Sequence, residues 1–199
     1  MQESTFKPSV DYQPHSDLET DVTEFLEGLG FAVHQSTYHS IMPKELVRII
    51  QNRFTPTCLY VRGRADRLAI HKVEPIDFEW EAKTHANPKY GDLTIELQPL
   101  LHHISKSRLG VQCLYVFRVN NKDGGFWVNN IPPMRCAWFP PRVEYNASKD
   151  LWMKATKELF PGLKIVETPV NGSGDPFVII NQSDISNIQD WRELILELL

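Results

Sequence analysis

The sequence has little positive charge, and this shortage limits which partners its surface as a whole can bind. Lysine and arginine number 21 against 25 aspartates and glutamates, which gives a formal net charge of −4 at pH 7. We therefore exclude a protein that coats nucleic acid with its entire surface. A protein with a local basic groove around an acidic site remains compatible with this balance, because such a site needs only local positive charge and is itself acidic.

Cysteines and long hydrophobic runs are scarce as well. The three cysteines are far apart and form no Cys-x-x-Cys pair, which argues against zinc ribbons and redox dithiols. Cys58 and Cys113 lie in apolar runs and are predicted to be small core residues. No apolar run approaches the roughly 18 residues of a membrane span, and the polar start lacks the apolar region of a signal peptide. We expect a soluble, cytoplasmic protein.

The sequence does contain enough apolar residues to form a core. Of its 199 residues, 42% are hydrophobic and 23% are charged, which is typical of a globular domain. Residues 1–15 hold two prolines and no periodic pattern, so we predict an irregular lead-in. Residues 16–125 are predicted to form the main core. Residues 126–199 begin with a run rich in aromatics and proline, and we predict a C-terminal elaboration packed on the core.

The periodicity of apolar residues predicts helices that alternate with strands. Ser16 and Glu19 match a capping box at the start of the first helix, and Gly28 and Gly30 predict its end. The order of elements indicates an α/β sheet with helices packed on it. The predicted helices cover residues 16–28, 43–52, 93–107, 149–159 and 185–198, and the predicted strands cover 31–33, 57–61, 68–70, 76–83, 111–119, 163–167 and 177–180.

The predicted strand 76–83 alternates between apolar and charged side chains. We expect Ile76, Phe78, Trp80 and Ala82 on one face and Asp77, Glu79, Glu81 and Lys83 on the other. Glu81 and Lys83 are two residues apart, so their side chains leave the strand on the same face. Glu79 shares this face, either as a further ligand or, as we favour, as a surface acid.

Asp66 precedes this strand and follows Gly63, where a missing side chain lets backbone or ligand approach closely. A strand, turn and returning strand would bring Asp66 beside Glu81. Two carboxylates from neighbouring strands suit Mg²⁺, which usually takes one or two carboxylates and keeps several waters. A lysine beside them can orient or deprotonate a water and balance negative charge on phosphate. The same three residues could instead form a solvated ion-pair cluster.

These motifs, Gly63-Arg64-Ala65-Asp66 and Glu81-Ala82-Lys83, resemble those of the PD-(D/E)XK nuclease superfamily. The segment 19–33 is similar to the first helix of Holliday-junction resolvases, and Gln98 is placed like the glutamine of RecB-like nucleases. The resemblance implies a mixed central sheet flanked by helices, that is, a restriction-endonuclease-like core. It also implies catalytic roles for Asp66, Glu81 and Lys83, with Glu19 (or, less favoured, Glu24) as the helix carboxylate.

The implied reaction is the hydrolysis of DNA phosphodiester bonds by an endo- or exodeoxyribonuclease that depends on Mg²⁺, for which Mn²⁺ can substitute. Asp66 and Glu81 would be the metal ligands. Basic residues cluster around Asp66, and a lysine and a glutamine follow the catalytic strand in the sequence. We expect the nucleic acid to be bound by Arg62, Arg64, Arg67, Lys89 and Gln98.

Several alternatives stay open at this point. The same fold could bind nucleic acid or a protein without hydrolysis. RNA stays open as a substrate because no residue here is predicted to contact the sugar. Cutting of a junction or of both strands would predict a homodimer with two active sites. His102 and His103 are adjacent on a predicted helix, so they point in different directions and cannot hold one ion together.

Overall fold

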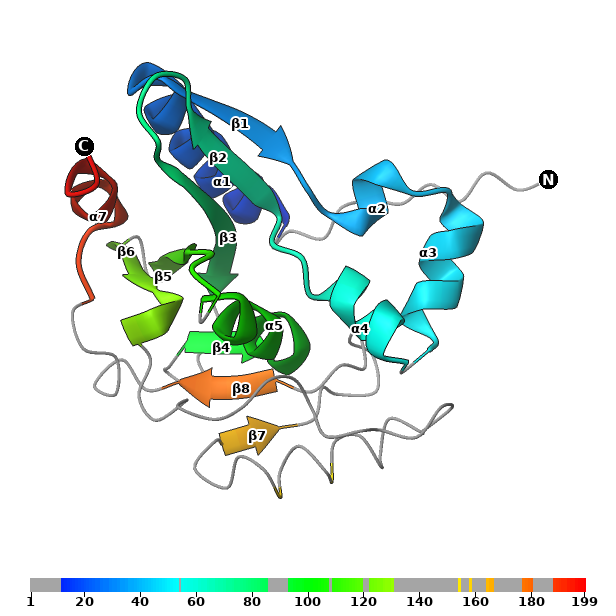
Figure 1. Cartoon of the computed structure of the whole chain (residues 1–199). Helices are drawn as coiled ribbons and strands as arrows, with labels where there is room; N and C mark the ends of the chain where they lie inside the picture. The colour runs from blue at the N-terminus through cyan, green and yellow to red at the C-terminus, as the bar shows by residue number, and fades with distance from the viewer. Residues whose placement is uncertain are drawn as a thin grey trace.

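The computed structural model describes residues 12–53, 55–85, 93–107, 109–119, 122–130, 154, 158, 164–166, 177–180 and 188–199. Its centre is a five-stranded mixed sheet in the order β1-β2-β3-β5-β6, with β3 and β5 parallel and the other neighbours antiparallel (Figure 1). The predicted mixed central sheet flanked by helices is confirmed. The strands are β1 (Phe31–Gln35), β2 (Arg67–His71), β3 (Asp77–His85), β5 (Cys113–Val119) and β6 (Lys122–Trp127).

Helices cover the two faces of this sheet. Helix α1 (Tyr12–Gly28) begins before the predicted capping box and packs on the apolar side of β3. It ends where predicted, and Gly30 takes φ +96°, a conformation that suits glycine, before β1 starts. Helix α5 (Leu97–Ser107) covers the opposite face, where Lys106 pairs with Glu79 of β3.

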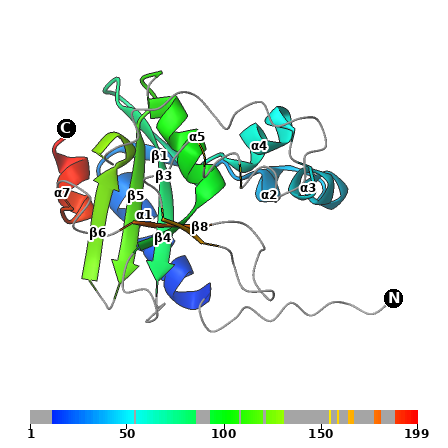
Figure 2. The same ribbon diagram turned by 90° about the horizontal axis from the view of Figure 1, so that it is seen from below.

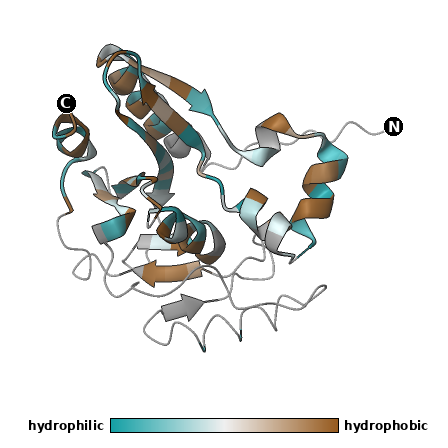
Figure 3. Ribbon diagram, viewed as in Figure 1, coloured by the Kyte–Doolittle hydropathy of each residue, from teal (hydrophilic) through white to brown (hydrophobic). Residues whose placement is uncertain are grey.

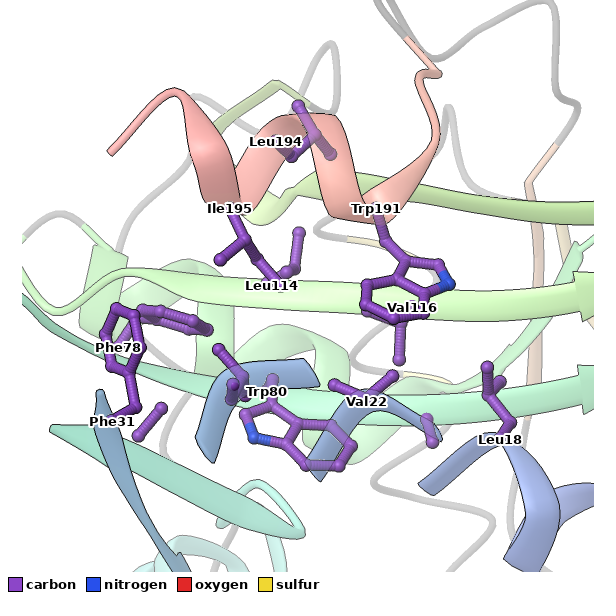
Figure 4. Packing of buried hydrophobic residues seen from close by; sticks show 13 residues of the cluster. Leu18, Val22, Phe31, Phe78, Trp80, Leu114, Val116, Trp191, Leu194 and Ile195 are labelled. Carbon is purple, nitrogen blue, oxygen red and sulfur yellow. The ribbon is translucent and has the colours of Figure 1, made fainter. Parts of the chain in front are cut away.

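The apolar core lies between the sheet, α1 and the C-terminal helix α7 (Trp191–Leu196). Figure 4 shows Trp80 of β3 beside Val22 of α1, whereas Trp191 of α7 lies nearer to Val116 of β5. Helix α7 is shorter than the predicted helix 185–198, because Asp190 caps it by accepting a hydrogen bond from the Arg192 N–H. Within the described residues, no helix is long and apolar enough to cross a membrane.

Three short helices are inserted between β1 and β2, namely α2 (Tyr38–Ile41), α3 (Lys44–Gln51) and α4 (Pro56–Arg62). Helix α3 matches the predicted helix 43–52, but the predicted strand 57–61 is wrong. Its apolar, β-branched run is too short for periodicity to separate strand from helix. Pro56 stands at the first helical position, where its missing N–H costs nothing. We refer to residues 38–64 as the helical arm.

A second sheet, in the order β4-β8-β7, lies beside the first. Its strands are β4 (Leu93–Glu96), β8 (Phe177–Ile180) and β7 (Lys164–Val166), and the last two match their predictions. The predicted helix 93–107 is wrong over its first four residues, because β4 pairs with β8. Since α5 starts only at Leu97, Pro99 lies in its first turn, where no N–H is needed. The predicted division at residue 126 stays a prediction.

Candidate active site

The charged face of β3 carries Glu81 and Lys83 side by side. The Lys83 ammonium donates to Glu81 Oε1 at 2.6 Å. Both groups are mostly shielded from water, with side-chain exposures of 5% for Glu81 and 15% for Lys83. Helix α5 covers this face of the sheet, so the pair is not a solvated surface contact. Burial of two charges is costly, and it is usual where a site has a chemical role.

Asp66 reaches this pair through the loop that leads from the helical arm into β2. Its backbone N–H donates to Glu81 Oε2 at 3.0 Å. Ser36, just after β1, holds the loop from the other side, since its N–H donates to the Asp66 carbonyl at 2.9 Å and its hydroxyl to the Ala65 carbonyl at 2.5 Å. A Cβ at Gly63 would lie 2.5 Å from Cβ of His102. The close packing of this loop on α5 therefore requires glycine.

Glu96 is a member of the site that the sequence analysis missed. Its Oε2 lies 4.0 Å from the Lys83 ammonium. It stands at the end of β4, which the sequence analysis assigned to a helix. The alternation of Leu93 and Ile95 with polar residues was the available signal, but it is too short to separate from helical spacing.

Glu19 of α1 also points toward the site and accepts a hydrogen bond from Arg67 Nη2 at 3.0 Å. The charge of Glu19 contributes to raising the pKa of Asp66, so Glu19 lies close enough to Asp66 for their charges to interact. Glu24, the less favoured alternative, is exposed on the same helix. The structure thus brings Glu19 together with Asp66, Glu81 and Lys83.

The electrostatics of the site are dominated by an excess of carboxylates. Burial raises the pKa of Asp66 well above its usual range, the charges of Glu81, Glu19 and Glu96 raise it further, and only Lys83 opposes them. Burial alone would lower the pKa of Lys83, but the surrounding carboxylates raise it well above its ordinary value. Lys83 is therefore a protonated ammonium at neutral pH.

The charges at the site suit a divalent cation. Four carboxylates face two cationic side chains, which leaves two negative charges in excess when all are ionised. These groups are Glu19, Asp66, Glu81, Glu96, Lys83 and Arg67. Among the described residues, no three potential ligands lie close enough together to hold an ion by themselves. Mg²⁺ needs only one or two protein carboxylates with waters, so the oxygen donors present fit it.

The predicted nucleic-acid contacts are not gathered on one surface. Arg62 is 9% exposed, and its guanidinium donates to the Gln51 carbonyl at 3.2 Å, so it holds α4 against α3. Arg64 is exposed beside the site, whereas Arg67 is engaged by Glu19. Lys89 lies outside the described residues. Gln98 lies in the first turn of α5, and its side chain is also outside the described part.

A buried layer of aromatic and histidine side chains supports the site from α5. His103 and Tyr115 are joined through His103 Nδ1 and the tyrosine hydroxyl at 2.8 Å. Burial, together with the charges of Lys106 and Arg64, lowers the pKa of His102 from 6.5 to about 4. Burial likewise lowers the pKa of His103. Both rings are therefore neutral at pH 7 and serve as packing under the loop of Gly63.

Glu79, predicted as a surface acid, is instead mostly covered. Its side chain is 12% exposed and pairs with Lys106 of α5. This ion pair fixes α5 to the charged face of β3, because it joins the two elements directly. Glu79 therefore has a partner of its own and stands apart from the group around Asp66.

Comparison with solved structures finds proteins of similar fold. No protein-family model matches the sequence, and no curated protein matches it either. The chain is similar to Hjc, a Holliday junction resolvase of the archaeal hyperthermophile Archaeoglobus fulgidus, with 11% identity and a TM-score of 0.45. The match covers 92% of this chain and 99% of that one. It is a likeness of fold alone.

Proposed function

We propose that this protein is a metal-dependent nuclease of the PD-(D/E)XK type that hydrolyses phosphodiester bonds in DNA. One observation carries the proposal. Glu81, shielded from water in the middle of the central strand β3, joins the Asp66 backbone and the Lys83 ammonium in one connected arrangement. A buried carboxylate-rich site with a single charged lysine is costly for stability, and phosphodiester hydrolysis gives such a site a purpose.

Asp66 and Glu81 would hold Mg²⁺, or Mn²⁺ in its place. When bound, the ion polarises the phosphoryl oxygen and lowers the pKa of a bound water. Glu19, already near Asp66, would contribute through the waters around that ion. Its pairing with Arg67 keeps it oriented toward the loop of Asp66.

Lys83 is charged, so it acts as a donor rather than a base. It lies between Glu81 at 2.6 Å and Glu96 at 4.0 Å, which fixes its ammonium group in place. From there it can orient the attacking water and balance negative charge that develops on the phosphate. Glu96 is a positioning residue in this scheme, because it acts through Lys83.

Arg64 is the predicted basic residue best placed to contact a phosphate beside the site, since it is exposed two residues before Asp66. Contacts of this kind bind without reading sequence and weaken as salt rises. Cutting of both strands of a duplex, or of a junction, would require two active sites and hence a homodimer.

A second candidate function is a binding module that keeps the nuclease fold without hydrolysis. It is favoured by the state of Glu81, whose two oxygens are already occupied by Lys83 and by the Asp66 N–H. A cation must displace or share these contacts. If the ion pair is too stable to be opened, the site binds no metal.

The test is cleavage of linear, single-stranded, flap and junction DNA with Mg²⁺, Mn²⁺ or EDTA. Asp66→Asn and Lys83→Ala are compared with Asp77→Asn, which makes the same Asp-to-Asn change at an exposed position on the strand that carries Lys83. We expect metal-dependent cleavage that falls at least about a hundredfold in the first two variants and is retained in the third. If well-folded wild type cuts none of these substrates, or a matching RNA panel, the binding module is the correct description.

A further inference from the structure

The helical arm has a charge opposite to that of the rest of the chain. Residues 38–64 contain five basic residues and one acidic residue, which is a net charge of +4. The chain as a whole has 21 basic and 25 acidic residues, so the remainder has 16 and 24, a net charge of −8. An insertion of this sign on an acidic protein indicates a surface for an anionic partner.

The basic side chains of the arm face the solvent. Lys44, Arg48 and Arg53 are exposed, as is Arg64 at the end of the arm. Lys44 and Arg48 are four apart on α3, so they lie on one face of that helix. Among the described residues, no ion pair involves any of these four side chains. Their charges are therefore available to a partner.

The arm leads directly into the candidate active site. Its last helix packs against α5, and its last residues pass through Gly63 to Asp66. Arg62 joins α4 to the end of α3 through the Gln51 carbonyl, so the basic helix and the Asp66 loop are mechanically connected. Figure 2 shows α2, α3 and α4 beside the sheet, on the opposite side from α7.

We propose that the helical arm is the surface that binds the sugar-phosphate backbone of the nucleic acid and brings it to Asp66. This inference rests on the proposed function, which makes a phosphodiester the reacting group. Helix α3 is about 12 Å long by its eight residues, enough to follow several phosphates of one backbone. The arm binds without reading sequence, because its exposed cations can be satisfied by phosphate alone.

Exposed apolar side chains on the same arm offer a competing use. Leu46 and Ile49 are 47% and 42% exposed, and Figure 3 shows α3 alternating between hydrophobic and hydrophilic residues. A second copy of the chain could cover them. The charge contrast favours nucleic acid, since two copies would bring two arms of net positive charge together.

The test is binding of a short fluorescent DNA duplex of mixed sequence, and of the matching RNA duplex, in EDTA. The arm variant Lys44→Gln/Arg48→Gln/Arg53→Gln is compared with Lys72→Gln/Lys122→Gln/Lys154→Gln, an equal charge change at exposed positions elsewhere. We expect the arm variant to bind at least about tenfold more weakly, with a salt slope lower by about 2 to 3. The control should differ from wild type by less than about twofold.

Equal weakening in both variants, or no binding by wild type, would overturn the proposal. The binding test is run without metal, so its result does not depend on cleavage. If the arm binds nucleic acid in this test but the protein does not cleave with Mg²⁺ or Mn²⁺, the nuclease proposal is contradicted and the proposal for the arm stands. Circular dichroism and thermal unfolding confirm that both variants are folded. If Leu46→Ser/Ile49→Ser converts a dimer to a monomer while the arm variant binds nucleic acid normally, the arm is a contact between two copies.

Discussion

Successive residues of β3 point to opposite faces of the sheet, and the two faces differ in character: one is apolar and the other is charged. Phe78, Trp80 and Ala82 are at most 1% exposed and join the core with α1 and α7. Glu79, Glu81 and Lys83 are also mostly covered, by α5, but each is paired with an opposite charge. One face provides stability through apolar burial. The other holds charged side chains whose burial costs stability.

The burial of Glu81 distinguishes the proposed metal site from a solvated ion-pair cluster on the same strand. A solvated strand face with an ordinary ion pair would leave Glu81 accessible to water, whereas its side chain is 5% exposed. Changes on the apolar face should therefore affect folding and leave the chemistry of the folded fraction intact. Changes on the charged face should do the reverse.

The largest stability effect is expected on the apolar face, at Trp80. Replacing this fully buried side chain by alanine leaves a cavity in the apolar core, and we expect a loss of about 3–5 kcal/mol in the free energy of unfolding. Chemical denaturation measures it. Cleavage per folded molecule should change little. A loss below about 1 kcal/mol would contradict the assignment of this face to the core.

A smaller effect on the free energy of unfolding, which depends on pH, is expected at His102 of α5. Its pKa is lowered from 6.5 to about 4, so the unfolded chain binds the proton more readily. The stability from the neutral ring is fully present above pH 6.5 and is lost as pH falls toward 4, by at most about 3 kcal/mol. His102→Gln should flatten this decline in denaturation curves between pH 7.5 and 5, whereas His34→Gln, at an exposed position, should not.

The smallest effect on the free energy of unfolding is expected at Asp66, where the substitution should stabilise the fold instead of destabilising it. Its raised pKa means that the folded state disfavours the charged carboxylate, so stability falls as pH rises above the ordinary value. Asp66→Asn should therefore increase the free energy of unfolding in EDTA, by on the order of 1 kcal/mol. Added Mg²⁺ should abolish this advantage by stabilising the wild type alone. A destabilised variant in EDTA would show that Asp66 is structural.

The sequence predicted that Asp66, Glu81 and Lys83 lie close together, and it predicted the elements around them less well. Asp66, Glu81 and Lys83 could be paired because residues two apart on a strand share a face and Gly63 marks a tight approach. Glu96 could not be found, because β4 is a strand only through its pairing with the distant β8. The helix at residues 57–61 was missed for a similar reason, since local preference in a short apolar run is weak.

The burial of the charged face of β3 could not be predicted from the sequence pattern of that strand. The alternation in β3 predicts two faces but not what covers each one. Lys106 of α5 reaches Glu79 across 27 positions of sequence, and this pairing places the helix over the site. Such non-local contacts decide whether a charged face is solvated or covered.

The most direct test of the account is Mn²⁺ binding, measured by calorimetry on wild type, Glu81→Gln and Asp77→Asn. Both variants remove one carboxylate charge from the same strand, but only Glu81 contacts Lys83 and the Asp66 loop. The account predicts that wild type and Asp77→Asn bind Mn²⁺ and that Glu81→Gln binds it at least about tenfold more weakly. Binding that is absent from wild type, or equally strong in all three proteins, would contradict the claim that the charged face of β3 is a metal site.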